Sequence, residues 1–286
     1  MERWPGAEKP YGINATGIGL RHPHVQEILE TRPPIPWFEA LTDNYLNPGS
    51  LLAAQLDAVS DAYPVALHGV GMSLGSVDPL DRAYLTKVKA LAARIKTPWI
   101  SEHLSFTSVN GLYSHDLLPL PFTQEAVDHL VDRIKQVQDF FGEAILVENA
   151  TAYLRFSSSE MSEVEFLQQI LERADCGLLL DLTNLYINSV NHGENVQDLL
   201  LGIPLGRIRQ IHLAGHEHKP GFLLDAHNNK VADPVWALYS QIRAMGVVAP
   251  ALIEWDSDIP ALSVLRNQAE RANQITVDPI LTAGSL

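Results

Sequence analysis

The sequence lacks three features that would place it in particular protein classes. A single cysteine, Cys176, excludes an internal disulfide and any metal site built from several thiolates, and it fits a reducing compartment. No charge-free apolar run approaches the roughly 18 residues of a transmembrane helix. The segment from Met1 to Gly17 also lacks the unbroken apolar stretch of a signal peptide. We therefore expect a cytoplasmic protein without a membrane partner.

Positive charge is also scarce in this chain. There are 20 Lys and Arg residues against 34 Asp and Glu residues, which gives a formal net charge of −14. Nucleic-acid binding normally depends on an excess of Lys and Arg, so the composition predicts no nucleic-acid partner. An acidic protein instead favours small molecules, metal cations or basic peptides.

Short apolar runs alternate with segments of helical periodicity along the chain, which is typical of an α/β fold. The expected strands are residues 17–20, 37–42, 65–69, 99–106, 144–149, 177–182, 207–213 and 251–255. The expected helices are residues 50–62, 81–96, 123–141, 162–174, 195–201, 234–245 and 259–273, with another near 24–30. Eight strand–helix units predict a single (β/α)₈ TIM barrel in one domain, residues 1–286, with a core of about 12–275 and short terminal tails.

The stretch from Ile208 to His227 is the strongest indication of a functional site. An apolar strand ends here at His212, and the residues that follow within one short loop are His216, Glu217, His218, Asp225 and His227. Imidazole and carboxylate groups together are the ligands that Zn, Mn and non-haem Fe use in proteins. In a TIM barrel the chemistry lies at the C-terminal ends of the strands, so this loop predicts a metal site there.

The other expected strands also end in ionisable or polar residues. A buried carboxylate without a partner is costly, and a cation beside it removes that cost. The candidate metal ligands are His68, His103, Glu148, Asp181, Asn184, His212, Asp225, His227 and Glu254. Nine are too many for one ion, because a catalytic zinc uses about three protein ligands, so we expect two or three metals. The six expected to take part in catalysis are His68, His103, Glu148, Asp181, His212 and Glu254.

Several choices within these motifs depend on strand alternation. Only one of Glu102 and His103 points inward in a regular strand, and we choose His103, with Glu102 as an acceptor that holds an imidazole. Glu254 and Asp256 share a face, and we favour Glu254 because it is nearer the strand body. The glycines after His68 do not have dinucleotide-loop spacing, and we expect them to let the backbone pass close to His68 or to a substrate. His192 is expected in a loop, with its role left open.

Eight short motifs carry a resemblance to a known family. They are HGVG at 68–71, SEHLS at 101–105, LPLPFT at 118–123, LVEN at 146–149, LDLTNLY at 180–186, IHLAGH at 211–216, DAH at 225–227 and LIEWD at 252–256. In this order they resemble the multinuclear non-haem iron-dependent oxidative enzymes, a family that includes the iron oxidase of methanobactin maturation. The resemblance extends from about Gly17 to Ala261.

This resemblance implies a TIM barrel that binds two or three irons through the nine ligands named above. The residue types alone also suit Zn or Mn. It also implies O₂-dependent oxidation of a ribosomally made precursor peptide, commonly at cysteine, with a small partner protein that presents the peptide. The chain departs from the family pattern at Thr183, where Asn is usual, and at Asn228–Asn229, where Asp or Gly is more typical.

We expect two or three metal positions: His68, His103 and Glu148 at one, Glu148, Asp181, His212 and Glu254 at the second, and Asn184, Asp225 and His227 at the third if a third ion binds. Two other functions remain open. One is a divalent-metal (Zn or Mn) enzyme of the sugar-isomerase-like or phosphoesterase barrel type, in which the metal activates water or polarises a carbonyl. The other is a non-catalytic scaffold that uses the barrel only as a platform.

Overall fold

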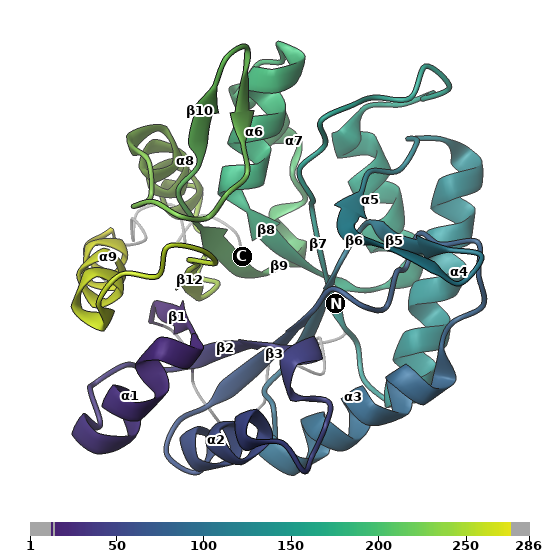
Figure 1. Ribbon diagram of the computed structural model, residues 1–286. Helices are drawn as coiled ribbons and strands as arrows, with labels where there is room; N and C mark the ends of the chain where they lie inside the picture. Colours follow the sequence, from purple (N-terminus) through teal and green to yellow (C-terminus); the bar gives the residue numbers. More distant parts are fainter. Residues whose placement is uncertain (1–12, 14, 276–286) are drawn as a thin grey trace, which may run out of the picture.

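Parallel strands close into a barrel in the computed structural model, which describes residues 13 and 15–275 (Figure 1). The strands of the barrel are β1 (Gly17–Gly19), β2 (Phe38–Leu41), β3 (Val65–Gly69), β4 (Ile100–His103), β7 (Leu146–Glu148), β8 (Gly177–Asp181), β9 (Ile208–Leu213) and β12 (Ala251–Ile253). Each pairs in parallel with its neighbours, and β1 closes the ring by pairing with both β2 and β12. The predicted (β/α)₈ barrel is therefore confirmed. Residues 1–12, 14 and 276–286 of the expected domain lie outside the described residues.

Helices follow the strands and surround the barrel (Figure 1). They are α1 (Val25–Thr31), α2 (Leu51–Ser60), α3 (Arg82–Ile95), α4 (Gln124–Phe141), α5 (Glu163–Ala174), α6 (Leu182–His192), α7 (Val196–Gly202), α8 (Asp233–Ala244) and α9 (Leu262–Gln274). Short 3₁₀ helices cover His22–His24, Thr42–Tyr45 and Leu205–Arg207. Among the described residues we find no helix with the length and apolar character that a membrane span requires.

Capping side chains fix where several helices begin. Ser50, Asp81, Thr123 and Ser162 each accept a hydrogen bond from a backbone N–H in the first turn of the helix that follows. Such a bond satisfies a donor that has no partner within the helix. These caps explain why the helix starts agree with the sequence prediction to within one residue at all four positions.

Two features differ from the prediction. Residues 182–192 form helix α6 directly after β8, whereas the sequence predicts a loop around His192. The carboxylate of Asp181 caps α6 by accepting from Asn184 N, and Gly193 ends the helix with a φ of 69°. Two antiparallel hairpins were also not predicted: β5 (Phe106–Val109) with β6 (Leu112–Leu118), and β10 (Glu217–Lys219) with β11 (Phe222–Leu224). Both hairpins follow barrel strands and therefore lie at the C-terminal face.

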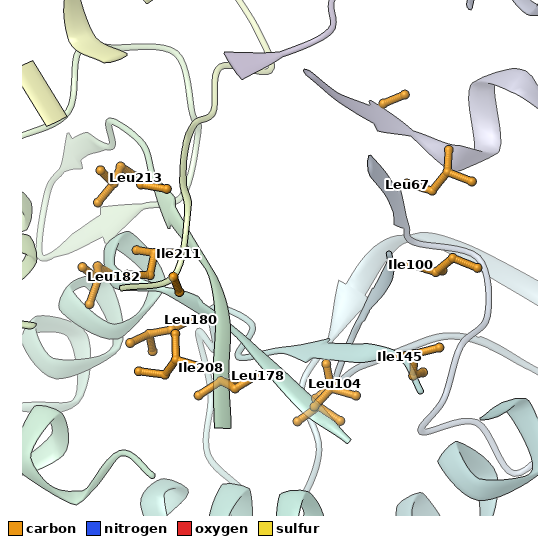
Figure 2. Close-up of a cluster of buried hydrophobic side chains, with 14 of the residues drawn as sticks. Leu67, Ile100, Leu104, Ile145, Leu178, Leu180, Leu182, Ile208, Ile211 and Leu213 are labelled. Carbon is orange, nitrogen blue, oxygen red and sulfur yellow. The ribbon is translucent and has the colours of Figure 1, made fainter. Parts of the chain in front are cut away.

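Alternation along the strands separates the packing core from the barrel interior. Leu178 and Leu180 of β8 and Ile211 of β9 join the large buried cluster between strands and helices (Figure 2). The residues that alternate with them point into the barrel. Asp181 and His212 therefore lie inside it, with Asp181 Oδ2 4.0 Å from His212 Nδ1. A smaller cluster of Trp37, Ala66 and Leu252, with Trp99 packed against it, fills the interior below the polar side chains.

Candidate metal centre

The carboxylate of Glu148 lies at the centre of the polar cluster. Glu148 ends β7, and its Oε2 atom is 3.0 Å from His68 Nε2 and 3.2 Å from His103 Nε2. Its other oxygen, Oε1, is 3.6 Å from His212 Nδ1. Four strands, β3, β4, β7 and β9, thus direct their terminal side chains to one point, and all four residues are buried. The two oxygens of Glu148 face two different sets of histidines.

His212 and Glu254 extend the cluster toward β12. His212 Nδ1 lies 2.9 Å from Glu254 Oε2 and 4.0 Å from Asp181 Oδ2. The same Glu254 oxygen is 3.3 Å from His227 Nδ1. Each contact joins an imidazole nitrogen to a carboxylate oxygen, which are the ligand atoms that first-row transition metals share.

His227 brings in the loop after β11. Its Nε2 atom is 2.7 Å from Asp225 Oδ1, and its Nδ1 atom is 3.1 Å from Asp256 Oδ2. Its backbone oxygen accepts from Asp256 N at 2.7 Å, and its φ of 43° lies in the left-handed region. This rarely used backbone conformation, held by the end of β12, is a feature often found at functional sites.

Four overlapping groups of ligand atoms, each lying within 4.8 Å of one another, can be drawn among these residues. They are His68, His103 and Glu148; His68, His212 and Glu254; Glu148, Asp181 and His212; and Asp181, His227 and Glu254. The first matches the first expected metal position. Three ligands of the second expected position, Glu148, Asp181 and His212, form one group, while Glu254 belongs to two others. For the third, the structure groups His227 with Asp181 and Glu254 instead of with Asn184.

Asn184 lies at the site with its amide already committed. Its Oδ1 accepts from Thr151 Oγ1 at 2.7 Å, and its Nδ2 donates to Asn149 O at 3.1 Å. These bonds hold the loop after β7, and Asn184 still lines the central cavity. The structure thus brings together all nine predicted ligands, seven directly in the four groups, Asp225 through His227, and Asn184 at the wall.

Several buried ligand atoms of this cluster lack a well-aligned hydrogen bond, which bears on whether the cluster fits a cation. Glu148 Oε2, Asp181 Oδ2, His212 Nδ1, Asp225 Oδ1 and His227 Nε2 are buried and make no well-aligned hydrogen bond, although some of them lie close to each other, as His227 Nε2 and Asp225 Oδ1 do at 2.7 Å. Buried polar atoms are normally satisfied, and an orphaned one costs on the order of 1–3 kcal/mol. Four of the five residues, Glu148, Asp181, His212 and His227, belong to the ligand groups, so cations held by these groups would give their buried atoms a partner. The donor set therefore fits metal binding.

The electrostatics of the cluster couple metal binding to protons. Burial alone would raise the pKa of Glu148, but the charges of the surrounding histidines hold it well below its usual range. Burial opposes charge on His103, yet the Glu148 carboxylate raises the pKa of His103 to about 10. Burial raises the pKa of Asp181 to about 8, with the Glu148 charge adding to the effect. The metal-free site therefore holds protons at neutral pH that an entering cation must displace.

A cavity of about 560 Å³ opens above the cluster. Its walls include His68, His103, Asn184, Asp225, His227 and Glu254, together with Arg21, Asp116, Leu117 and Tyr153. Tyr153 Oη accepts from Asp225 N at 2.8 Å, so the loop after β7 fixes the loop after β11. The candidate ligands are thus accessible from one side, which a catalytic metal site requires.

Nearly the whole chain matches one known protein family. Residues 15–277 match the family described as "RiPP precursor modification enzyme MbnB/TglH/ChrH". The chain belongs to this family. Its members are enzymes that modify precursors of RiPPs, which are ribosomally synthesised and post-translationally modified peptides. The expected family is thereby confirmed, and it indicates an enzyme that modifies a precursor peptide. The buried cluster of this member can bind metal ions.

Other relatives and solved structures agree with this family and fold. A UPF0276 protein of Acaryochloris marina is 48% identical over 261 residues, covering 91% of this chain and 94% of its own. A UPF0276 protein of Anaeromyxobacter is 45% identical over 260 residues, covering 91% and 92%. Endonuclease IV from Thermus thermophilus has a TM-score of 0.58 at 17% identity, covering 90% and 99%. An L-ribulose 3-epimerase has a TM-score of 0.56 at 16% identity, covering 89% and 86%. The two structures share the fold alone.

The two departures from the family pattern have structural roles in this member. Thr183 is buried, and its Oγ1 accepts from Ala214 N at 2.9 Å, so it fixes the segment after β9. Asn228 Nδ2 donates to Glu217 Oε1 at the base of the β10–β11 hairpin. Neither residue belongs to the four ligand groups.

Two smaller features of this site concern Glu102 and the glycines after His68. Glu102 Oε1 lies 3.8 Å from His103 Nδ1, whereas Gly69 O is nearer to the same nitrogen at 3.0 Å. Glu102 instead accepts from the backbone N–H groups of Met72 and His103. The glycines make room for protein side chains: a Cβ on Gly69 would lie 2.7 Å from Glu102 Oε2, and one on Gly71 would lie 2.4 Å from Asp43 Oδ1.

The histidines on either side of the ligand groups have other contacts. His216 stacks near His218 and Tyr186, with ring centroids 5.3 and 5.5 Å away, and lies outside the four groups. His192, in α6, bonds through Nε2 to Ala152 O at 2.7 Å, so its role is to hold the loop after β7.

Three residues that lie beside the ligands were not among the predicted site residues. Glu39 of β2 is buried, with Oε1 3.0 Å from His212 Nε2, and Gln210 of β9 is buried beside both. Arg21 donates through Nε to Trp255 O at 2.8 Å and through Nη2 to Asp256. An acidic residue inside the apolar strand Phe38–Leu41 was the available signal for Glu39, because a buried carboxylate requires a partner.

Proposed function

We propose that this protein is a multinuclear non-haem iron enzyme that uses O₂ to oxidise a precursor peptide, with cysteine as the modified residue. The observation that carries the proposal is the position of Glu148 between His68 and His103 on one oxygen and His212 on the other. A carboxylate in this position would hold a cation with each of its oxygens. The proposal places the enzyme in the cytoplasm, where ribosomal peptides are made.

Different residues of the cluster would bind different metal ions. His68, His103 and Glu148 would hold one ion, and Asp181, His212, His227 and Glu254 would hold the others. Bound iron would supply the redox chemistry with O₂, while the protein supplies position, an open cavity and exclusion of bulk water. Nitrogen and oxygen ligands without thiolate suit Fe, and also Zn or Mn. Iron is therefore part of the proposal, and its loading needs a direct test.

The cavity and its rim support a peptide substrate. A volume of about 560 Å³ is enough for a side chain and a short stretch of main chain, but not for a folded domain. Exposed apolar residues stand on the loops and hairpins of this face: Leu112, Tyr113, Tyr153, Leu154 and Phe222. Large exposed apolar groups around a cavity are typical of interaction surfaces. We propose that the peptide crosses this rim and inserts its cysteine, and that a small partner protein presents it there.

The fold likeness to epimerases and endonuclease IV does not favour the divalent-metal alternative. The L-ribulose 3-epimerase is 16% identical and endonuclease IV 17% identical, which shows a shared barrel, on which many chemistries occur. The family match instead favours a peptide substrate.

The test is oxygen uptake by anaerobically iron-loaded protein mixed with a cysteine-containing precursor peptide, one encoded beside its gene. The proposal predicts O₂ consumption and a mass change of the peptide, both lost when the peptide cysteine is replaced by serine. Glu148→Gln is expected to abolish both, whereas Glu125→Gln on the exposed face of α4 leaves them unchanged. A zinc-loaded protein that is fully active without O₂ would overturn the proposal.

A further inference from the structure

A buried chain of polar side chains lies directly below His212, on the side away from the cavity. Glu39 comes from β2 and reaches His212 of β9 across the barrel, with Oε1 3.0 Å from Nε2. The second oxygen of Glu39 accepts from Gln210 Nε2 at 2.5 Å. Gln210 Oε1 in turn accepts from Trp99 Nε1 at 2.5 Å. Glu39, Gln210 and His212 are at most 3% exposed.

The two nitrogens of His212 therefore face different surroundings. Nδ1 faces the candidate metal ligands, 2.9 Å from Glu254 Oε2 and 3.6 Å from Glu148 Oε1. Nε2 faces Glu39. A neutral imidazole carries one proton, and the nitrogen that binds a metal must be the one without it. A carboxylate acceptor at Nε2 keeps the proton there and leaves the Nδ1 lone pair for the ion.

Gln210 competes with Glu39 for the same nitrogen, because Gln210 Nε2 is 2.8 Å from His212 Nε2. The indole N–H of Trp99 fixes the orientation of the Gln210 side-chain amide. It donates to Gln210 Oε1, so the amide nitrogen Nε2 points toward Glu39. Nε2 can either donate to the carboxylate or accept from the amide. An unprotonated Nε2 would place its lone pair 3.0 Å from a buried carboxylate oxygen, whereas a protonated one forms a charge-assisted hydrogen bond, which is about twice as strong as a neutral one. Donation to Glu39 is the favoured arrangement.

We propose that Glu39 is a positioning residue of the metal centre, whose carboxylate holds the proton of His212 on Nε2 and commits Nδ1 to the ion. Gln210 and Trp99 hold Glu39 in place by donating along the chain that ends on its other oxygen. The inference rests on the metal centre of the proposed function. It does not depend on the identity of the peptide or on the redox step.

The test is the affinity of the anaerobic protein for Fe(II), measured by competition with a chelator, in Glu39→Gln and in the unaltered chain. Loss of an outer carboxylate of this kind typically weakens metal binding about 10- to 100-fold, and we expect a loss of that size. The Mössbauer spectrum of the bound iron should also change, since the donor strength of one imidazole falls. Glu125→Gln, which removes an exposed charge on α4, should alter neither measurement.

A rescue variant separates positioning from a merely structural role. The double variant Glu39→Gln/Gln210→Glu moves the carboxylate from position 39 to position 210. In the unaltered chain, Gln210 Nε2 lies 2.8 Å from His212 Nε2. We expect this double variant to recover most of the lost affinity and the original spectrum. Wild-type affinity and an unchanged spectrum in Glu39→Gln would overturn the inference, and so would a loss that the double variant fails to restore. Weakened iron binding in a protein that does not oxidise any peptide would refute the proposed function and leave the role of Glu39 standing.

Discussion

The side chain of Asn149 exchanges two hydrogen bonds with the backbone of Asp181. Asn149 Nδ2 donates to Asp181 O at 3.0 Å, and its Oδ1 accepts from Asp181 N at 2.9 Å. The amide thus continues the pairing of β7 with β8 beyond Glu148, where β7 ends. Asp181 Oδ1 accepts from Asn184 N at 2.8 Å, which leaves Oδ2 directed at the metal ligands. Asn149 therefore fixes a candidate ligand without belonging to the ligand groups.

We expect Asn149→Ala to lower both stability and metal affinity. Two buried backbone groups of Asp181 lose their partners, which costs about 2 to 4 kcal/mol of unfolding free energy. Urea unfolding of the metal-free protein measures the first effect and Fe(II) titration the second. Asn267→Ala, at an exposed position of α9, is the control and should lower neither. Equal stability of Asn149→Ala and the control would contradict the assigned role.

Replacing Glu148 should remove more metal ions per chain than replacing His103. Glu148 belongs to two of the four ligand groups, whereas His103 belongs to one. We expect His103→Ala to lose one ion per chain and Glu148→Gln to lose two, as measured by elemental analysis after anaerobic reconstitution. If both variants lose the same single ion, Glu148 does not bridge.

Metal uptake should release protons. The pKa of His103 is raised to about 10 by the Glu148 charge, against the effect of burial, and burial raises that of Asp181 to about 8. Both groups therefore carry a proton at pH 7 in the metal-free protein, and a cation must displace it. Apparent affinity should rise about tenfold per pH unit for each displaced proton. Calorimetry in two buffers of different ionisation enthalpy counts these protons, and a count of zero would be inconsistent with the geometry.

Glu163 should make the protein less stable as pH rises. Burial raises the pKa of Glu163 from 4.5 to about 7, with Asn188 Nδ2 at 3.4 Å from its oxygens. A carboxyl whose pKa is higher in the folded state binds its proton more tightly there. The protonated carboxyl stabilises the fold fully below pH 4.5, and this stabilisation is lost as pH rises through 7. The free energy of unfolding falls by about 3 kcal/mol over this range.

The matching variant for this effect is Glu163→Gln, which cannot ionise. Relative to the unaltered chain, it should gain stability between about pH 4.5 and pH 7 in urea unfolding. Glu125→Gln, at an exposed position, controls for the loss of one negative charge. A constant difference between Glu163→Gln and the unaltered chain across this range would show that Glu163 does not titrate there.

The barrel and most of the site could be predicted because they depend on local rules. Strand alternation places every second residue inside a parallel barrel, so the polar residues at successive strand ends meet at one rim. His68, Glu148, Asp181 and His212 follow from this rule without knowledge of their partners, and the structure places them together.

The rest depended on contacts between distant segments. Glu39 and His212 are far apart in the sequence, and nothing near Glu39 indicates which residue across the barrel it meets. Helix α6 continues directly from β8, so no turn residues separate strand from helix. The side chain of Asn184 is engaged by Thr151, and His227 is grouped with Asp181 instead, which periodicity does not reveal.

The most direct test of the central claim is Mössbauer and EPR spectroscopy of protein reconstituted anaerobically with isotopically enriched Fe(II). It reports both the number of bound irons and whether they are magnetically coupled. Because Glu148 faces His68 and His103 with one oxygen and His212 with the other, the account predicts two or three irons per chain, with at least two coupled. A single isolated iron per chain, or failure to take up iron, would contradict it.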